Sequence, residues 1–187
     1  MLFIFDKSCR GGVQPLRYKQ LVEDLPKSRK EKLNKLKTEQ DKLICVIEYY
    51  AVKKLLKLKT NQDFSYTSNG KPYIEGKKHF SISHSNNLLC IASSSQPISV
   101  DVQPIEYNEE VANFICTPSE LNNLKTAKNK AKELTKLFTK KESAIKCLDL
   151  NLTHIKTVLE NKNLRFKTKQ KQNYLITICK QKTKKAN

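Results

Sequence analysis

The stretch ISVDVQ, at residues 98–103, lies in the middle of the 187-residue chain and predicts a strand. Side chains alternate between the two faces of a strand, so Asp101 and Gln103 share one face and the two valines share the other. We expect the valines to anchor the strand in the core and to hold Asp101 on a rigid platform. The alternative interpretation is the exposed polar face of an ordinary strand.

A long helix is expected before this stretch. Thr38 and Asp41 resemble a capping box, and apolar residues follow at helical spacing until about Leu58. A turn is expected at Ser68-Asn69-Gly70, and a Lys-rich stretch covers residues 26–37. Strands are predicted at residues 2–5, 64–67, 80–83 and 88–94.

The chain after this stretch repeats the same organisation. Thr117-Pro118-Ser119-Glu120 predicts a helix start, and a longer helix is expected at residues 131–148. Strands are predicted at residues 155–159, 164–167 and 174–179. Each half therefore reads as a long helix followed by about three strands. We expect an α+β fold, a pseudo-twofold pair of similar halves, each a long helix packed on a small, mostly antiparallel sheet. The halves are residues 1–97 and 98–187, with a frayed basic tail from about residue 180.

The composition narrows the class of protein. There are 36 basic and 18 acidic residues, and the net charge of +18 attracts nucleic acid, acidic proteins and phosphorylated cofactors alike. Six cysteines without C-x-x-C spacing indicate free thiols in a reducing compartment, so we expect a cytoplasmic protein. No apolar run reaches the roughly 18 residues of a spanning helix, so no membrane association is expected.

Two further segments carry side chains suited to chemistry. Gly70-Lys71-Pro72 offers a turn and a cation, and Ser83-His84-Ser85 gathers hydrogen-bonding groups where a strand is expected to end. Such a cluster suits a phosphate, although a plain polar loop has the same composition. Farther along, Glu142 and Lys146 are four residues apart on one helix face, which fits either a site or a surface ion pair.

Taken together, these segments resemble the Sfp-type 4′-phosphopantetheinyl transferases, over about residues 26–150. The resemblance rests on their order: Gly70-Lys71-Pro72, then Phe80-Ser81-Ile82-Ser83-His84-Ser85, then Val100-Asp101-Val102-Gln103, then residues 141–146, KESAIK. It implies transfer of 4′-phosphopantetheine from coenzyme A, the co-substrate, to a serine of an apo acyl or peptidyl carrier protein, with release of 3′,5′-ADP.

The resemblance also implies a metal and catalytic site. Asp101 and Glu142 are expected to bind Mg²⁺, with Mn²⁺ left open, and Gln103 to complete the metal shell directly or through water. Glu142, or a water it orients, is expected to take the proton from the carrier serine. Lys146 is expected to bind the pyrophosphate of coenzyme A and neutralise its charge as 3′,5′-ADP leaves. The charge requirements of phosphoryl transfer suit this division of roles.

Coenzyme A contacts follow from the same resemblance. Ser83 and His84 are expected to meet the 3′-phosphate or the ribose, and Lys71 to lie beside the adenine or a phosphate. Arg29 and Lys32 match a basic pair that approaches the 3′-phosphate.

Four positions depart from the family pattern. Gln103 stands where Glu is frequent, Ser99 where Gly is usual, Phe138 where Trp is common, and Ile44 where an Arg often stands. We expect a lower metal affinity from Gln103, because a neutral amide is a weaker ligand than a carboxylate.

Two alternatives remain beside the transferase. A catalytically weak relative that binds coenzyme A without transfer would fit Gln103 and Ser99. A basic nucleic-acid-binding module would explain the charge, but the chain has no helix-turn-helix, zinc-finger or aromatic-basic RNA-binding motif. Nucleic acid is therefore expected to bind only non-specifically. Carrier recognition helices are typically acidic, which suits the basic surface. By analogy with the family, we expect a monomer.

Overall fold

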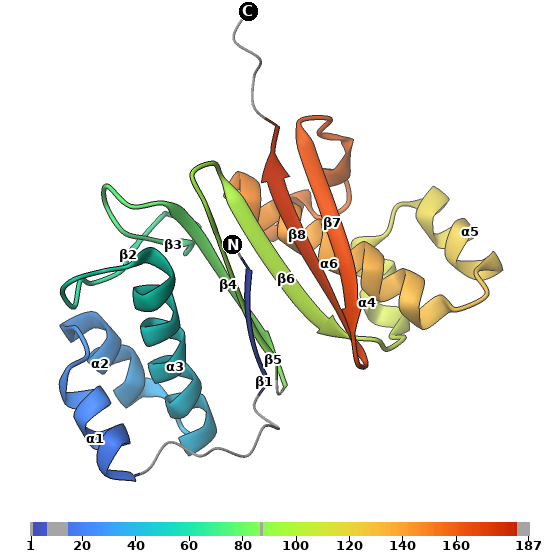
Figure 1. Cartoon of the computed structure of the whole chain (residues 1–187). Helices are drawn as coiled ribbons and strands as arrows, with labels where there is room; N and C mark the ends of the chain where they lie inside the picture. The colour runs from blue at the N-terminus through green and yellow to red at the C-terminus, as the bar shows by residue number, and fades with distance from the viewer. Residues whose placement is uncertain (1, 7–14, 87, 183–187) are drawn as a thin grey trace, which may run out of the picture.

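A computed structural model describes residues 2–6, 15–86 and 88–182 of the chain (Figure 1). The first half holds β1 (Leu2–Asp6), α1 (Pro15–Glu23), α2 (Lys27–Lys35), α3 (Glu39–Leu56), β2 (Ser65–Tyr66), β3 (Pro72–Tyr73), β4 (His79–Ser85) and β5 (Leu88–Ser94). The second holds β6 (Ile98–Pro104), α4 (Glu109–Ile115), α5 (Pro118–Thr126), α6 (Lys130–Leu148), two 3₁₀ turns (Leu152–His154 and Val158–Glu160), β7 (Leu164–Lys171) and β8 (Tyr174–Gln181).

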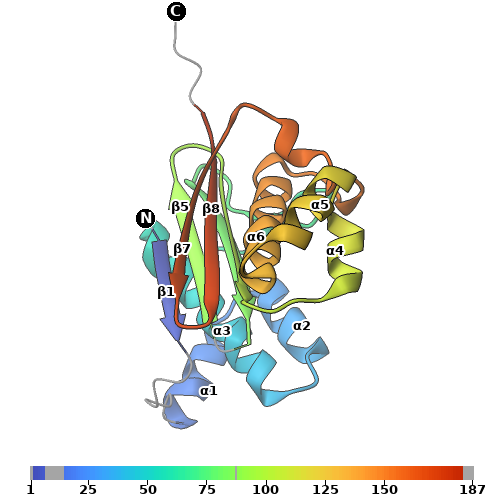
Figure 2. The same ribbon diagram turned by 90° about the vertical axis from the view of Figure 1, so that its right-hand side faces the viewer.

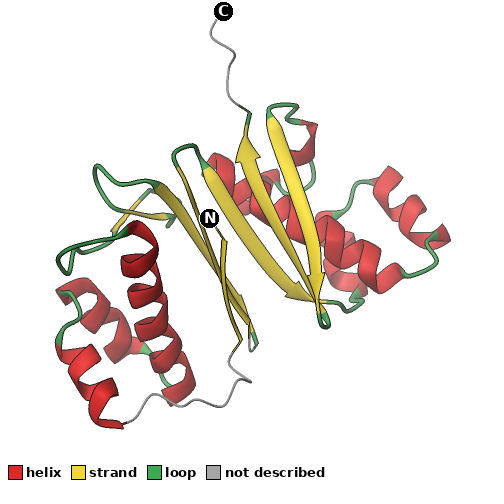
Figure 3. Cartoon of the chain, in the orientation of Figure 1, coloured by secondary structure: helices red, strands yellow, loops and turns green. Residues whose placement is uncertain are grey.

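Two three-stranded antiparallel sheets form the centre of the molecule, in the orders β1-β5-β4 and β6-β8-β7. Both sheets have the same connectivity: one strand, then helices, then a hairpin whose second strand pairs with the first. The α+β class is confirmed, and Figure 3 shows the strands lying between two groups of helices. A twofold axis relating the halves, and their division at residue 97, stay predictions.

One sequence prediction about the strands is corrected. Strands β2, β4 and β5 follow α3 as predicted, with the short β3 besides, but among the described residues only β7 and β8 follow α6, so the third strand expected there was wrong. Residues 155–159 do not form a strand but lie around two 3₁₀ turns. Ile155 and Val158 are both buried there, three residues apart, which is the spacing of one face of a 3₁₀ turn. The predicted tail is described only as far as residue 182.

The helices α1, α2 and α4 were not predicted. In α2 the buried side chains are only Arg29 and Leu33, so its apolar face is too narrow to stand out from the lysines around it. By contrast, the capped starts of α3 and α5 were predicted: Thr38 accepts a hydrogen bond from the N–H of Asp41, and Thr117 and Glu120 form a full capping box.

Each long helix packs on its own sheet. Residues of α3, including Tyr49 and Val52, pack with Phe80 and Ile91 of the first sheet. Helix α6 lies against the second sheet, and Figure 2 shows α4 and α5 on its outer side, away from the strands. A third apolar cluster joins the sheets to each other, formed by Leu88, Cys90 and Ala92 of β5, Ile98, Val100 and Val102 of β6, and Ile176 of β8.

Strands β4 and β6 run side by side in the same direction and are linked by serine hydroxyls. Ser81 Oγ accepts a hydrogen bond from the N–H of Val100, and Ser83 Oγ accepts one from the N–H of Val102, both at 3.2 Å. Both valines are fully buried, which confirms their predicted role as anchors. These hydroxyls satisfy backbone donors that would otherwise be buried without partners.

Helix α6 is held by buried polar contacts. Lys141 is fully buried, and its Nζ donates to the backbone oxygens of Ile115 and Lys156 at 2.7 and 3.1 Å. It also lies 2.7 Å from a carboxylate oxygen of Glu120. One ammonium thus joins α6 to the end of α4, the start of α5 and the 3₁₀ region.

We expect Lys141→Met to destabilise the fold by about 3 kcal/mol, because the acceptors around Nζ lose their shared partner while Glu120 stays charged. Urea denaturation measures the change. Lys132→Met, at an exposed position of the same helix, should change the free energy of unfolding by less than about 0.5 kcal/mol. A similar loss of unfolding free energy in both variants would contradict a stabilising role for the buried contacts of Lys141.

Candidate functional site

Asp101 lies at the centre of the polar contacts between β4, β6 and α6. Its side chain is fully buried, and its Oδ1 accepts hydrogen bonds from Ser83 Oγ at 2.9 Å and Lys146 Nζ at 2.5 Å. Gln103 Nε2 lies 3.4 Å from Oδ2. The predicted shared face of Asp101 and Gln103 is thus present, but Asp101 is covered rather than exposed.

The ammonium of Lys146 lies between two carboxylates. It is 2.5 Å from Asp101 Oδ1 and 3.8 Å from Glu142 Oε2. Burial raises the pKa of Glu142, the negative charge of Asp101 raises it further, and Lys146 opposes both. Glu142 is therefore a better proton acceptor than an ordinary surface glutamate.

A cleft of about 540 Å³ opens beside this cluster, between the turn at residues 69–72 and the second half of α6. Glu142, Lys146 and Lys71 all line it. Burial lowers the pKa of Lys71, although nearby negative groups, including Asp149, oppose the shift. The cleft thus brings together charged groups that are far apart in the sequence.

The turn beside the cleft is attached to the end of α6. Thr67 Oγ1 donates to Asp149 Oδ1 and Asn69 Nδ2 donates to the Asp149 carbonyl, both at 2.8 Å. Gly70 has φ +81°, a conformation that favours glycine, and its N–H donates to the Thr67 carbonyl. The predicted turn is confirmed, and it sets Lys71 across the cleft from α6.

Ser83 and His84 do not share one site. Strand β4 continues through Ser85, so the expected strand end at Ser83 was wrong, and neighbouring side chains point to opposite faces. Ser83 contacts Asp101, whereas His84 Nδ1 lies 3.1 Å from Glu48 Oε1 on α3.

Arg29 and Lys32 gather around the same carboxylate. The nearest distances from Glu48 Oε2 are 3.2 Å to Arg29 and 3.7 Å to Lys32. Arg29 is 1% exposed, and it also donates to the Cys45 carbonyl and lies over the Phe64 ring. Direct contact of these residues with coenzyme A stays a prediction.

Glu48 was missed by the sequence analysis. An acidic residue stands within the buried stripe of α3, next to Tyr49 and two residues after Val46. A carboxylate is rarely buried without a partner, so this position was the available signal.

The donors around Lys146 suit a hard divalent cation. Asp101 and Glu142 offer carboxylate oxygens and Gln103 an amide, the ligand types that Mg²⁺ prefers. Both carboxylates face the same positive charge, and the Lys146 side chain is 33% exposed, which leaves it room to turn toward the cleft. Within residues 2–6, 15–86 and 88–182, no cluster of three or more His, Cys, Asp or Glu is present that could hold a metal.

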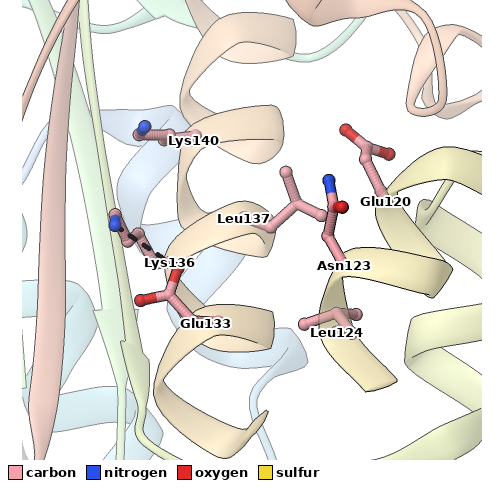
Figure 4. A pocket seen from close by; sticks show the side chains of 7 residues that line it. All are labelled: Glu120, Asn123, Leu124, Glu133, Lys136, Leu137 and Lys140. Carbon is pink, nitrogen blue, oxygen red and sulfur yellow. Dashed lines mark hydrogen bonds and ion pairs between the residues drawn. The ribbon is translucent and has the colours of Figure 1, made fainter. Parts of the chain in front are cut away.

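A second pocket, of about 210 Å³, lies between α5 and α6 (Figure 4). Leu124 and Leu137 line it together with the ion pair Glu133–Lys136. None of the predicted site residues lines this pocket, so the cleft beside Lys146 remains the candidate site.

Comparison with known proteins supports the part of this site that comes from the second half of the chain. A family model described as ACPS, the 4′-phosphopantetheinyl transferase superfamily, matches residues 97–186. The match supports phosphopantetheine transfer in general. It covers just under half of the chain, including Asp101, Gln103, Glu142 and Lys146, whereas the predicted coenzyme A contacts from Arg29 to His84 lie outside it. No curated protein matches the chain.

The superfamily match confirms the predicted resemblance at that level, while the Sfp-type subfamily stays a prediction. Coenzyme A as co-substrate and a carrier protein as acceptor agree with it in general terms. Among the described helices, none has the length and apolar character needed to cross a membrane.

The raised pKa of Glu142 predicts a pH-dependent stability. A carboxyl whose pKa is raised by folding destabilises the protein once it ionises, so Glu142→Gln should be more stable than wild type at pH 7 without divalent metal. The gain should disappear below about pH 4, where the carboxyl is protonated in both states.

Urea denaturation across this pH range tests the effect. Glu133→Gln is the matched control, because its carboxylate is half exposed on the same helix. A Glu142→Gln protein less stable than wild type at pH 7 would mean that attraction to Lys146 exceeds the cost of burial.

Proposed function

We propose that the chain transfers 4′-phosphopantetheine from coenzyme A to a serine of an apo acyl or peptidyl carrier protein and releases 3′,5′-ADP. The observation that carries the proposal is the convergence of Asp101 and Glu142 on Lys146, within the part of the chain that the superfamily model matches. Glu142 and Lys146 line one cleft, and Asp101 is buried behind them. The transfer requires charge neutralisation on phosphate oxygens and an activated hydroxyl, and this trio offers groups for both.

Glu142 is the proposed proton acceptor. It lines the cleft, and its raised pKa brings proton affinity closer to what a general base needs at neutral pH. The carrier serine would approach from the cleft, and Glu142, directly or through a water, would take its proton as the hydroxyl oxygen attacks the β-phosphorus of coenzyme A.

Lys146 is the proposed partner of the leaving group. Its ammonium is one third exposed and is already drawn to the cleft wall by two carboxylates. Turning toward the pyrophosphate would place positive charge on the oxygens that gain negative charge as 3′,5′-ADP departs.

Mg²⁺, or Mn²⁺, is the proposed cofactor. Asp101 and Glu142 would hold it, with Gln103 as a direct or water-mediated third group, and the ion would supply Lewis-acid neutralisation of the pyrophosphate. Ser83 keeps Asp101 in place through its hydroxyl, a role that differs from its expected contact with the 3′-phosphate.

The remaining features of the proposal rest on the resemblance and on composition. They are a pseudo-twofold pair of halves meeting near residue 97, a cytoplasmic location, an Sfp-type subfamily and a monomeric state. The net charge of +18 supports an acidic carrier as partner, since opposite charge speeds encounter.

One observation favours the weaker alternative, a relative that binds coenzyme A without transfer. Asp101 already accepts hydrogen bonds from Ser83, Gln103 and Lys146, and among the described residues two carboxylates, not three, lie beside Lys146. Incubation with apo carrier, coenzyme A and Mg²⁺, followed by mass spectrometry of the carrier, separates the two functions. Addition of one phosphopantetheine group supports transfer, and an unmodified carrier with bound coenzyme A supports the alternative.

Asp101→Asn should lower turnover by about 100-fold or more, because it removes one negative ligand while preserving side-chain size. Carrier modification measured over time gives the rate, and circular dichroism checks the fold. Asp149→Asn, at the end of α6, is a control for charge loss near the cleft. Near-normal turnover of Asp101→Asn at saturating Mg²⁺ would remove Asp101 from the site.

Gln103→Glu should lower the Mg²⁺ concentration needed for half-maximal rate, because a carboxylate binds a hard cation better than an amide. Turnover itself should change by less than about tenfold, or about 1.4 kcal/mol. A Mg²⁺ titration at saturating coenzyme A measures both. The control is Gln170→Glu at an exposed position of β7. An unchanged Mg²⁺ midpoint would place residue 103 outside the metal shell.

A further inference from the structure

One buried carboxylate organises three basic side chains from different elements. Glu48 of α3 meets Arg29 and Lys32 of α2 through Oε2, and His84 of β4 through Oε1. Both of its oxygens are thus occupied. Glu48 is the group that these three basic side chains share as an ion-pair partner.

The four side chains form two layers. The side chains of Arg29 and Glu48 are 2% and 5% exposed, whereas those of Lys32 and His84 are 48% and 49% exposed. The buried ion pair therefore lies beneath an ammonium and an imidazole that face solvent. Counting His84 as neutral, two cations meet one anion, and the cluster keeps an excess of positive charge.

The contact with Glu48 also orients the imidazole. A carboxylate near Nδ1 favours a proton on that nitrogen and fixes the ring plane. Nε2 is then the ring nitrogen that Glu48 does not engage. Burial alone would raise the pKa of Glu48, but the hydrogen bond with His84 and the charges of Lys32 and Arg29 lower it overall. Glu48 therefore remains ionised and able to hold its partners.

We infer that Glu48 is a positioning residue for coenzyme A contacts that the resemblance already predicts: it holds His84 and Lys32 at the surface, where both can reach one phosphate monoester. This inference rests on the proposed function, under which the natural ligand is the 3′-phosphate of coenzyme A. A phosphate oxygen accepts a hydrogen bond from the Lys32 ammonium, and a second from Nε2–H of a His84 imidazolium whose Nδ1–H donates to Glu48. Both groups lie on the solvent side of one fixed carboxylate. Glu48 does not contact the ligand in this arrangement.

A role of Glu48 through its charge and a role through positioning predict opposite effects of its removal on phosphate affinity. If Glu48 acted only through its charge, removing it would leave more positive charge and strengthen phosphate binding. If it acts by holding Lys32 and His84, removing it weakens binding although the net charge becomes more favourable. Glu48→Gln and Glu48→Asp together separate the two, because Asp keeps the charge but withdraws the carboxylate by one methylene group.

The test compares 3′,5′-ADP with 5′-AMP, which lacks the 3′-phosphate, by isothermal titration calorimetry without divalent metal. Wild type should bind 3′,5′-ADP about tenfold or more tightly than 5′-AMP. Both Glu48 variants should lose most of that preference, while the affinity for 5′-AMP changes by less than about twofold. Glu39→Gln, at the exposed start of the same helix, is the control and should keep the preference.

Several outcomes would overturn the inference. If the wild-type protein binds 3′,5′-ADP no more tightly than 5′-AMP, Lys32 and His84 do not form a 3′-phosphate site. A preference kept by Glu48→Asp and increased in Glu48→Gln means that Glu48 acts through charge alone. Equal loss of affinity for both nucleotides means a general structural role, and circular dichroism would identify an unfolded variant. The binding assay does not depend on transfer, so absence of transfer to a carrier contradicts the proposed function without contradicting the role of Glu48.

Discussion

The Ser83 hydroxyl is the interaction on which the site depends. It accepts the N–H of Val102 and donates to Asp101, so one oxygen joins the two sheets and also holds the central carboxylate. With Ser81 it replaces the backbone carbonyls that would normally pair neighbouring strands. The apolar cluster between the sheets contributes buried apolar surface. The two serine hydroxyls fix which residues of β4 lie opposite which residues of β6. Asp101 therefore has a defined position relative to the first half, not only relative to its own strand.

Each half places a different balance of charge beside its long helix. In the first half, two cations and an imidazole surround the single carboxylate of Glu48, whereas in the second half two carboxylates surround the single ammonium of Lys146. Buried charges must be paired, and an excess on either side is left for a ligand. The first arrangement suits an anion and the second a cation. A phosphorylated substrate that carries a metal ion at another phosphate would match both.

Much of the fold could be predicted because its signals are local. The strand at residues 88–94 agrees with β5 at both ends, and the capped starts of α3 and α5 follow from Thr38 and Thr117. Predictions failed where partners override local patterns. Ile155 is a residue type favoured in strands, but it directly follows a 3₁₀ turn and packs from there into the core of the second half. Helix α2 was hidden because Arg29, a basic residue, is one of its two buried side chains.

Local spacing was enough to predict the strand and helix faces on which Asp101, Glu142 and Lys146 lie. Which of these side chains meet depends on how β4, β6 and α6 pack together. Ser83 and His84 are neighbours in the chain, yet strand alternation sends one to Asp101 and the other to Glu48. Glu48 itself joined the site through contacts 16 to 36 residues away, which no local pattern encodes. Periodicity along one element fixes a side chain's direction, whereas the partner found there depends on how separate elements pack.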